Sequence, residues 1–294
     1  MSDLSKEYHI YLKLERGLSE NSVEAYEQDI KKLYEFRSDP EKMQFEDLQD
    51  FLHYQFSSET NVRSQARILS GIRSFYKFLI YHHYREDDPS ELLEWPKKEF
   101  HIPEVLTVEE INALVDAIDL SKADGHRNRA IIEMLYGSGL RVSELTELKL
   151  SCMYRKEGYM LIHGKGDKER LVPISPEADE WFGYWMEDRS RLDIHPEHKD
   201  IAFLNRNGKQ LTRMMIFTII KRLAAKAGIQ KTISPHTIRH SFATHLLQNG
   251  ADLRIIQQLL GHENITTTEI YTHIDIQDLK ETILKYHPVN QKKS

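Results

Sequence analysis

Four short segments combine cations or histidines with glycine or proline, at points where side chains can converge on a ligand. GSGLRVSEL places Arg141 and Glu144 directly after a pair of glycines, and GKGDKERLVPI places Lys165 in a polar turn. SPHTIRHSFATHLL begins with a serine–proline pair, and LLGHENITTTEIYTH carries a histidine nine residues before a tyrosine. The side chains of interest in these last two segments are His236, Arg239, His262 and Tyr271.

Together these residue types favour phosphate chemistry carried out by protein cations. Arginine can bind two non-bridging oxygens of a phosphodiester and stabilise the charge of a pentacoordinate transition state. Lysine can protonate a departing sugar oxygen when neighbouring cations lower its pKa. A tyrosine hydroxyl, with a reference pKa of ~10, becomes a nucleophile when cations or a base favour its anion. No acidic cluster suited to magnesium accompanies the set.

Each residue alone has a commoner explanation. An isolated arginine is usually a surface or salt-bridge residue, and one tyrosine among the 14 in this chain usually serves packing. His236 and His240 have the spacing of helical zinc ligands, and His245 follows them, but HTIRH lacks the glutamate of the HExxH motif. The arginine between the two histidines would also repel a cation. We therefore predict no metal ion here.

Composition favours a two-domain protein of the cytoplasm. A chain of 294 residues exceeds the usual size of one core, and 40% hydrophobic with 29% charged residues fits a soluble protein. No apolar run approaches the ~18 residues of a membrane span, and the N-terminus lacks a signal-peptide core. The single cysteine, Cys152, excludes an internal disulfide and fits a reducing compartment.

The net charge of −6 does not exclude nucleic-acid binding, because phosphate contacts depend on local charge and not on the total. Residues 61–84 contain no acidic side chain. Four cations in this stretch fall within an arc of about 120° on one helical face. A solvated face is the simpler alternative, but we expect these residues to contact DNA phosphates: Arg63, Arg67, Arg73 and Lys77.

Helical patterns dominate the elements that must position these residues. In residues 1–95 apolar positions recur at three- and four-residue spacing, which predicts a four-helix domain. Gly17 ends the first helix and Ser19 is a suitable N-cap for the second. The third and fourth helices are expected at 45–55 and 61–82.

A linker and a second domain follow. EWPKKEFHIP, residues 94–103, has two prolines and mixed charge, so we place an extended linker at 96–106 and a second domain at 107–294. Thr107 then resembles an N-cap followed by first-turn acids.

Within the second domain, helices to about residue 148 are interrupted at Gly137 and Gly139. The spacing of apolar residues changes at 159–174, where two apolar runs flank a polar turn, and this predicts a β-hairpin. A weaker strand-turn is expected at 201–211. The remainder is helical from Arg213 onward.

The order Arg, Lys, His-x-x-Arg, His, Tyr, with these flanks, resembles the tyrosine recombinase (phage integrase) family. LERGLSENSVEAYEQDI and ILSGIRSFYKFL resemble the core-binding domain of its Xer branch, and SPHTIRHSFATHLLQNGADLRIIQQLLGHENITTTEIYTH resembles the catalytic domain. The resemblance covers the whole chain. One departure is SCMYRKEG after LKL, where the family often has an acidic turn. That stretch only leads into the hairpin.

The resemblance implies a mainly α fold that clamps DNA: an N-terminal SAM-like four-helix core-binding domain and a mostly helical catalytic domain with a small antiparallel β-sheet. Tyr271 would form a 3′-phosphotyrosyl link, Lys165 would be the general acid and His236 would serve proton transfer. The phosphate would be held by Arg141, Arg239 and His262. Glu144 matches an acidic family position and would orient an arginine or histidine. No cofactor, metal or ATP is implied.

The implied partners are double-stranded DNA with a specific recombination site, a homo- or hetero-tetramer with a second Xer-type recombinase, and a septal DNA translocase, with no membrane insertion. Strands would exchange through a Holliday junction, resolving chromosome dimers at cell division. Three alternatives stay open: a mobile-element integrase or invertase of the same family, a catalytically inactive architectural DNA-binding protein, and a relaxing enzyme of the type IB topoisomerase kind.

An apolar stripe follows the tyrosine, at Ile276, Leu279, Ile283 and Tyr286. A helix of ~12 residues is marginal alone in water, so the stripe must dock on something. It could pack on its own domain. The resemblance favours docking in a neighbouring protomer.

Overall fold

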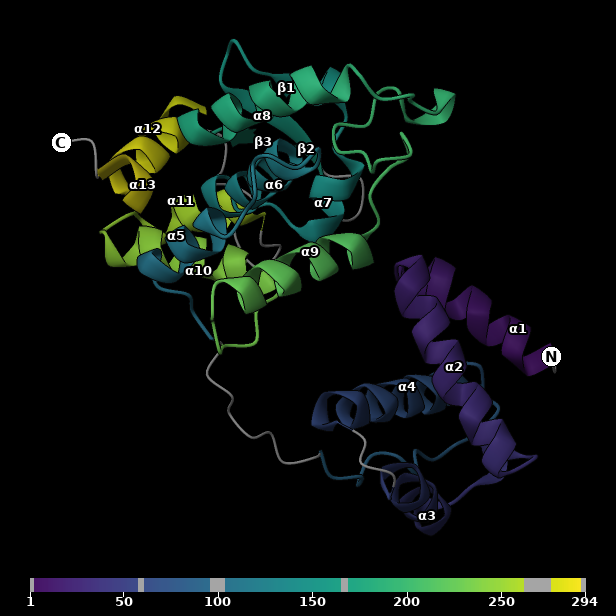
Figure 1. The fold of residues 1–294 in the computed structure, drawn as a ribbon. Coiled ribbons are helices and arrows are strands. Elements are labelled where there is room, and N and C mark those ends of the chain that lie inside the picture. Colours follow the sequence, from purple (N-terminus) through teal and green to yellow (C-terminus); the bar gives the residue numbers. More distant parts are fainter. Residues whose placement is uncertain (1–2, 58–60, 96–103, 165–168, 262–275, 292–294) are drawn as a thin grey trace. The chain divides into compact units, whose positions relative to one another are not determined.

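The computed structural model describes residues 3–57, 61–95, 104–164, 169–261 and 276–291 (Figure 1). The chain divides into two compact units, residues 1–101 and 102–294, which we call the N-terminal unit and the C-terminal unit. The predicted linker falls largely on residues 96–103, which lie outside the described part. None of the described helices is long and apolar enough to span a membrane.

The N-terminal unit is helical, as predicted. Its helices are α1 (Asp3–Ile10), continued by a π-helical turn (Tyr11–Glu15), α2 (Glu20–Phe36), α3 (Phe45–Phe56) and α4 (Val62–Tyr81), with a 3-10 turn at Pro40–Lys42. Gly17, at φ +58°, follows the first helical run, and Ser19 is the N-cap residue of α2. Helix α2 packs on α4 around a core that includes Leu33, Ile72 and Phe75.

The C-terminal unit is mostly helical with one small sheet. Its helices are α5 (Val108–Asp116), α6 (Gly125–Gly137), α7 (Val142–Glu147), α8 (Pro176–Arg189), α9 (Arg213–Lys226), α10 (Pro235–Gln248), α11 (Leu253–Leu260), α12 (Ile276–Tyr286) and α13 (Pro288–Gln291), with 3-10 turns at Leu150–Cys152 and Pro196–His198. The predicted start at Thr107 is confirmed: its hydroxyl accepts from the N–H of Glu110 at 3.2 Å, and Glu110 accepts from the N–H of Thr107 at 2.8 Å.

The sheet has three antiparallel strands in the order β1 (Met153–Tyr154), β2 (Tyr159–His163) and β3 (Glu169–Pro173). The β2–β3 hairpin is the one predicted at 159–174, whereas β1 was not anticipated. The weaker strand-turn predicted at 201–211 is confirmed in part: an antiparallel bridge joins Leu204 to Gln210 across a turn, and Ile201 bridges Lys149, but no longer strand forms in this segment.

Helix α6 lies at the centre of the C-terminal unit and packs on α8 and α10 (Figure 1). Every residue from 130 to 140 is buried. A helix enclosed on all sides carries few polar groups, and those present need partners. Glu133 accepts from Nε of Arg129 at 2.8 Å, and the hydroxyl of Tyr136 is 2.8 Å from Nδ1 of His245.

Helix α12 docks on its own unit. Leu279 and Ile283 are buried, and α12 packs against β3, α10 and α11. Nδ2 of Asn249 donates to the carbonyl of Tyr286 at 2.7 Å, and His287 is buried with its ring 4.7 Å from that of Tyr136. In the single chain the stripe therefore packs in cis. Docking in a neighbouring protomer was expected for the tetramer on DNA, and it stays a prediction.

Candidate active site

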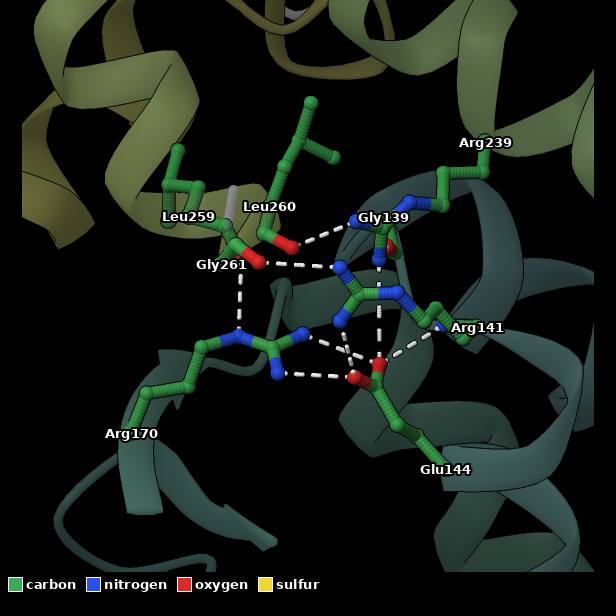
Figure 2. A network of polar contacts seen from close by, with 8 residues as sticks. All are labelled: Gly139, Arg141, Glu144, Arg170, Arg239, Leu259, Leu260 and Gly261. Carbon is green, nitrogen blue, oxygen red and sulfur yellow. Dashed lines mark hydrogen bonds and ion pairs between the residues drawn. The ribbon is translucent and has the colours of Figure 1, made fainter. Parts of the chain in front are cut away.

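A buried carboxylate, Glu144, organises the site (Figure 2). It lies in the first turn of α7, three residues after Arg141, so that one side chain can meet both the backbone and the guanidinium of Arg141. Its Oε2 accepts from the backbone N–H of Arg141 at 2.8 Å, and its Oε1 accepts from Nη1 of Arg141 at 2.7 Å. Gly139 permits this turn: it has φ +62°, and a Cβ there would lie 2.6 Å from the ring of Phe242.

Two further arginines face the same carboxylate. Nη1 and Nη2 of Arg170, on β3, donate to Oε1 and Oε2 of Glu144 at 2.7 and 2.9 Å. Nη1 of Arg239, on α10, lies 3.7 Å from Oε2 and donates to the carbonyl of Gly139 at 2.7 Å. Arg141, Arg170 and Arg239 are called the arginine cluster below. Its members come from segments far apart in the chain, yet they converge on one point.

The C-terminal end of α11 completes the cluster (Figure 2). Three successive carbonyls each accept a hydrogen bond from a different arginine: that of Leu259 from Nε of Arg170 at 3.2 Å, that of Leu260 from Nη2 of Arg239, and that of Gly261 from Nη2 of Arg141 at 2.9 Å. The end of a helix leaves carbonyls without intrahelical partners and carries partial negative charge, so cations are favoured there.

The electrostatics leave the cluster positively charged. Burial alone would raise the pKa of Glu144, but the hydrogen bonds and charge of Arg170, and then those of Arg141, lower it to about 2. Burial, reinforced by the charge of Arg141, lowers the pKa of Arg239 to about 9, which still leaves its guanidinium protonated at neutral pH. Three guanidinium groups thus share one carboxylate. Such a surplus suits an anion with several oxygens, such as a phosphodiester.

Exposure differs among the three arginines. The side chain of Arg141 is 39% exposed, whereas those of Arg170 and Arg239 are 13% and 6% exposed. Arg141 is therefore the member most accessible to a ligand from solvent. Arg170 was not among the predicted site residues, although it lies in the KERLVPI segment that we singled out for its lysine.

His236 lies one turn before Arg239, in the first turn of α10, and is exposed. The serine–proline pair begins this helix: the hydroxyl of Ser234 accepts from the N–H of Thr237 at 3.1 Å, and Pro235 is the first helical residue. His245 is buried in the same helix, and burial lowers its pKa. Its hydrogen bond to Tyr136 gives this histidine a structural partner.

Three predicted site residues, Lys165, His262 and Tyr271, lie outside the described residues. Their described neighbours are strand β3, which begins at Glu169, and Gly261, which directly precedes His262. The catalytic roles of these three side chains stay predictions.

The predicted DNA-contact residues of α4 have different surroundings. Arg67 donates to the fully buried Asp29 at 2.5 Å and to the carbonyl of Ala25 at 3.2 Å. Arg73 donates to the carbonyl of Leu93 at 2.7 Å, and its guanidinium lies 4.7 Å from the ring centre of Trp95. Lys77 is exposed, and the side chain of Arg63 lies outside the described part. Both described arginines thus have partners within their own unit, and contact with DNA stays a prediction.

In the described part of the chain, one group of side chains could supply three metal ligands: His195, Glu197 and His198, at the 3-10 turn that follows α8. The turn belongs to none of the segments that form the arginine cluster.

Two family descriptions match the chain. Residues 104–278 match the phage integrase family, and residues 6–83 match the phage integrase N-terminal SAM-like domain. Together they account for most of both units.

Named relatives and solved structures agree with these matches. The chain is 39% identical to tyrosine recombinase XerD of Staphylococcus aureus over 293 residues, 98% of this chain and 99% of the relative. The corresponding protein of Staphylococcus epidermidis is 38% identical over the same shares. The crystal structure of XerA recombinase is 30% identical, with a TM-score of 0.52 over 97% of this chain and 98% of that one. XerH recombinase in a post-cleavage complex with palindromic difH has the same fold, with a TM-score of 0.71 at 23% identity, over 95% of this chain and 84% of that one.

Proposed function

Because the chain belongs to the phage integrase family, we propose that it is a site-specific tyrosine recombinase, which cuts DNA, holds one end on a tyrosine and rejoins it to a partner duplex. The observation that supports this most is the arginine cluster. Arg141 and Arg239 meet at consecutive carbonyls of α11, directly before the predicted phosphate ligand His262. Two guanidiniums at one point suit a scissile phosphate, whose transition state carries added negative charge.

The proposed first step is attack of the Tyr271 oxygen on the scissile phosphorus. The phenolic proton passes toward His236, the bond between phosphorus and the 5′-oxygen breaks, and Lys165 protonates the departing 5′-oxygen. Arg141, Arg239 and His262 hold the non-bridging oxygens. The products are a 3′-phosphotyrosyl link and a free 5′-hydroxyl. Attack by a 5′-hydroxyl of the partner duplex reverses the step and produces the Holliday junction.

No ATP and no metal enter this scheme. One phosphodiester is exchanged for another, so the bond energy stays in the phosphotyrosine. The positive charge that a metal would supply comes from the guanidiniums.

The substrate and partners are proposed on the likeness to XerD, which covers nearly the whole chain. This likeness favours a recombinase that resolves chromosome dimers in the cytoplasm at cell division. A mobile-element integrase is the less favoured alternative. Four protomers, with or without a second Xer-type recombinase, would assemble on two specific sites, with a septal DNA translocase as activator. The N-terminal unit is proposed as the core-binding domain, and the C-terminal unit as the catalytic domain.

The decisive experiment traps the covalent intermediate. Footprinting on the terminus region of the host chromosome first identifies the bound site. A duplex with this site and a nick beside the scissile phosphate then releases a short strand on cleavage, which prevents religation. We expect the wild-type protein to become covalently attached to DNA, and Tyr271→Phe, which loses only the hydroxyl, to bind the same site without attachment.

Other outcomes identify the alternatives. Binding by the wild-type protein without any adduct would indicate an architectural protein. Relaxation of supercoiled DNA without a paired site would indicate a topoisomerase-like enzyme. An adduct at wild-type level with Tyr271→Phe would overturn the assignment of the nucleophile.

A further inference from the structure

Arg170 binds protein groups through every nitrogen of its guanidinium. Nη1 and Nη2 form a parallel pair of hydrogen bonds with Glu144, and Nε donates to the carbonyl of Leu259. The side chain is only 13% exposed. A two-pronged contact of this kind fixes the angle of a carboxylate as well as its distance. Arg170 is therefore built to hold Glu144 in one orientation.

That orientation matters because Glu144 has few acceptor positions. A carboxylate offers about four, two on each oxygen. Arg170 occupies one on each oxygen, and Arg141 occupies one on each through its backbone N–H and its Nη1. Arg239 stays at 3.7 Å, beyond hydrogen-bond distance. Because Arg170 occupies one lone pair on each oxygen of Glu144, it leaves Arg141 only the other two. The orientation of the Arg141 guanidinium therefore depends on Arg170.

Arg170 also contacts the end of α11 directly. Besides its bond to Leu259, its side chain packs on Gly261, where an added Cβ would lie 3.1 Å from Cδ and Nε of Arg170. Gly261 has φ +63° and immediately precedes His262. The position of Arg170 therefore limits where the chain leaves α11.

The charge balance gives Arg170 a second effect. With Arg170 present, its charge offsets that of Glu144, and the charges of Arg141 and Arg239 remain for an anion. Without it, the same carboxylate would be shared by Arg141 and Arg239 alone, and half of their positive charge would be offset. A phosphate would then be held less strongly where negative charge develops.

We propose that Arg170 is a positioning residue of the recombinase site: it fixes Glu144 and the end of α11 so that Arg141 and Arg239 meet the scissile phosphate, and it does not contact DNA itself. This inference rests on the proposed function. Arg170 would then be part of the site without acting as the nucleophile, as the general acid or as a phosphate ligand.

The test compares Arg170→Gln with the wild-type protein on the nicked duplex described above. We expect adduct formation to slow by about 10- to 100-fold, the range typical for partners that orient a catalytic group. Affinity for the uncleaved site should stay within about threefold of wild type, because other residues contact the DNA. A residue that binds phosphate equally in the ground state and the transition state would instead lose affinity and cleavage rate together. The Arg170→Lys and double variants described below separate a positioning role from direct contact with the transition state.

Arg155→Gln is the matched control. Arg155 also forms an ion pair within the C-terminal unit, with Asp179 at 2.5 Å, and it also lies beside the sheet, but it contacts no member of the arginine cluster. Its adduct formation should equal that of wild type. If neither the wild-type protein nor Arg155→Gln forms an adduct, the proposed function fails. If both do and Arg170→Gln matches them, only the role of Arg170 is overturned.

Two further variants keep the test decisive. Arg170→Lys restores the charge without the two-pronged contact, so it should fold normally and recover only part of the cleavage rate. If Arg170→Lys restored both the cleavage rate and the DNA affinity to the wild-type values, Arg170 would be a phosphate contact and the proposal would be overturned. Combining Arg170→Gln with Glu144→Gln should slow cleavage by less than the product of the two single effects, because both act through one carboxylate. Multiplicative effects would overturn the route through Glu144.

Discussion

Helix α4 of the N-terminal unit and the arginine cluster of the C-terminal unit use the same side chain in different ways. Arg67 is paired with one carboxylate, Asp29, so the pair carries no net charge. The cluster sets three arginines against Glu144, and each arginine also donates to a backbone carbonyl at the end of α11. Carbonyls satisfy hydrogen bonds without cancelling a formal charge. The arginines of the cluster, held largely by carbonyls, therefore keep positive charge for an anion, which a count of arginines in the sequence does not reveal.

This comparison also separates the residues of α4 from one another. Arg73 is held by the carbonyl of Leu93 and by the ring of Trp95, so its charge is not cancelled by a neighbouring acid in these contacts. Lys77 is exposed. Among the α4 residues predicted to contact DNA, Arg67 has its charge neutralised by Asp29 and therefore serves stability. Arg73 and Lys77 keep the positive charge that phosphate binding requires.

The largest expected effect is that of Arg239→Ala. It removes a guanidinium that would face the developing charge, so we expect cleavage of the nicked duplex to slow by about 1,000-fold. Site-specific binding should weaken far less, since most contacts lie elsewhere. Single-turnover adduct formation measures the first quantity and a gel-shift titration the second. An equal loss in both would assign Arg239 to ground-state binding.

Arg67→Ala should act on stability. It leaves Asp29, which is fully buried, without its cation, and we expect the free energy of unfolding to fall by about 3 kcal/mol. Burial already raises the pKa of Asp29, so an Asp29→Asn change in the same variant should recover part of the loss. Denaturant unfolding of both variants is the measurement. Unchanged stability with weakened DNA binding would instead make Arg67 a phosphate contact.

Low pH should reduce the contribution of Glu144 to the stability of the folded chain. Its pKa is about 2 in the folded chain against 4.5 for the free group, so the stabilisation is complete above pH ~4.5 and disappears as the pH falls toward 2. The stability difference between the wild-type protein and Glu144→Gln should shrink by about 2 kcal/mol between pH 7 and pH 3. Burial raises the pKa of Glu133, so Glu133→Gln should show a change of opposite sign. A pH-independent difference for Glu144→Gln would contradict the charge balance of the cluster.

Lys77→Ala should give the smallest effect. If Lys77 contacts one phosphate, its loss weakens DNA binding several-fold and lowers the salt dependence by about one unit on a double-logarithmic plot. Stability and the cleavage rate of bound DNA should not change. A salt dependence equal to that of wild type would remove Lys77 from the predicted contact surface.

Local signals in the sequence were enough for most helices. Thr107 predicted a helix start because an N-cap is followed by first-turn acids, and the serine–proline pair at Ser234 marked another. The two-residue strand β1 had no comparable signal, since its pairing with β2 defines it. Arg170 was missed for a related reason: its partners lie 26 and 89 residues away, and periodicity carries no information about such contacts. The pairing of Arg67 with Asp29, 38 residues earlier, was not predicted for the same reason.

The place of α11 in the chain has a consequence for synthesis. Arg141 is translated 120 residues before the carbonyl that holds it, and Arg239 is translated 21 residues before its own. A nascent chain that has emerged only through α10 already contains all three arginines, but it has no helix end on which to assemble them. The arginine cluster therefore cannot assemble on these carbonyls until residues 259–261 have left the exit tunnel.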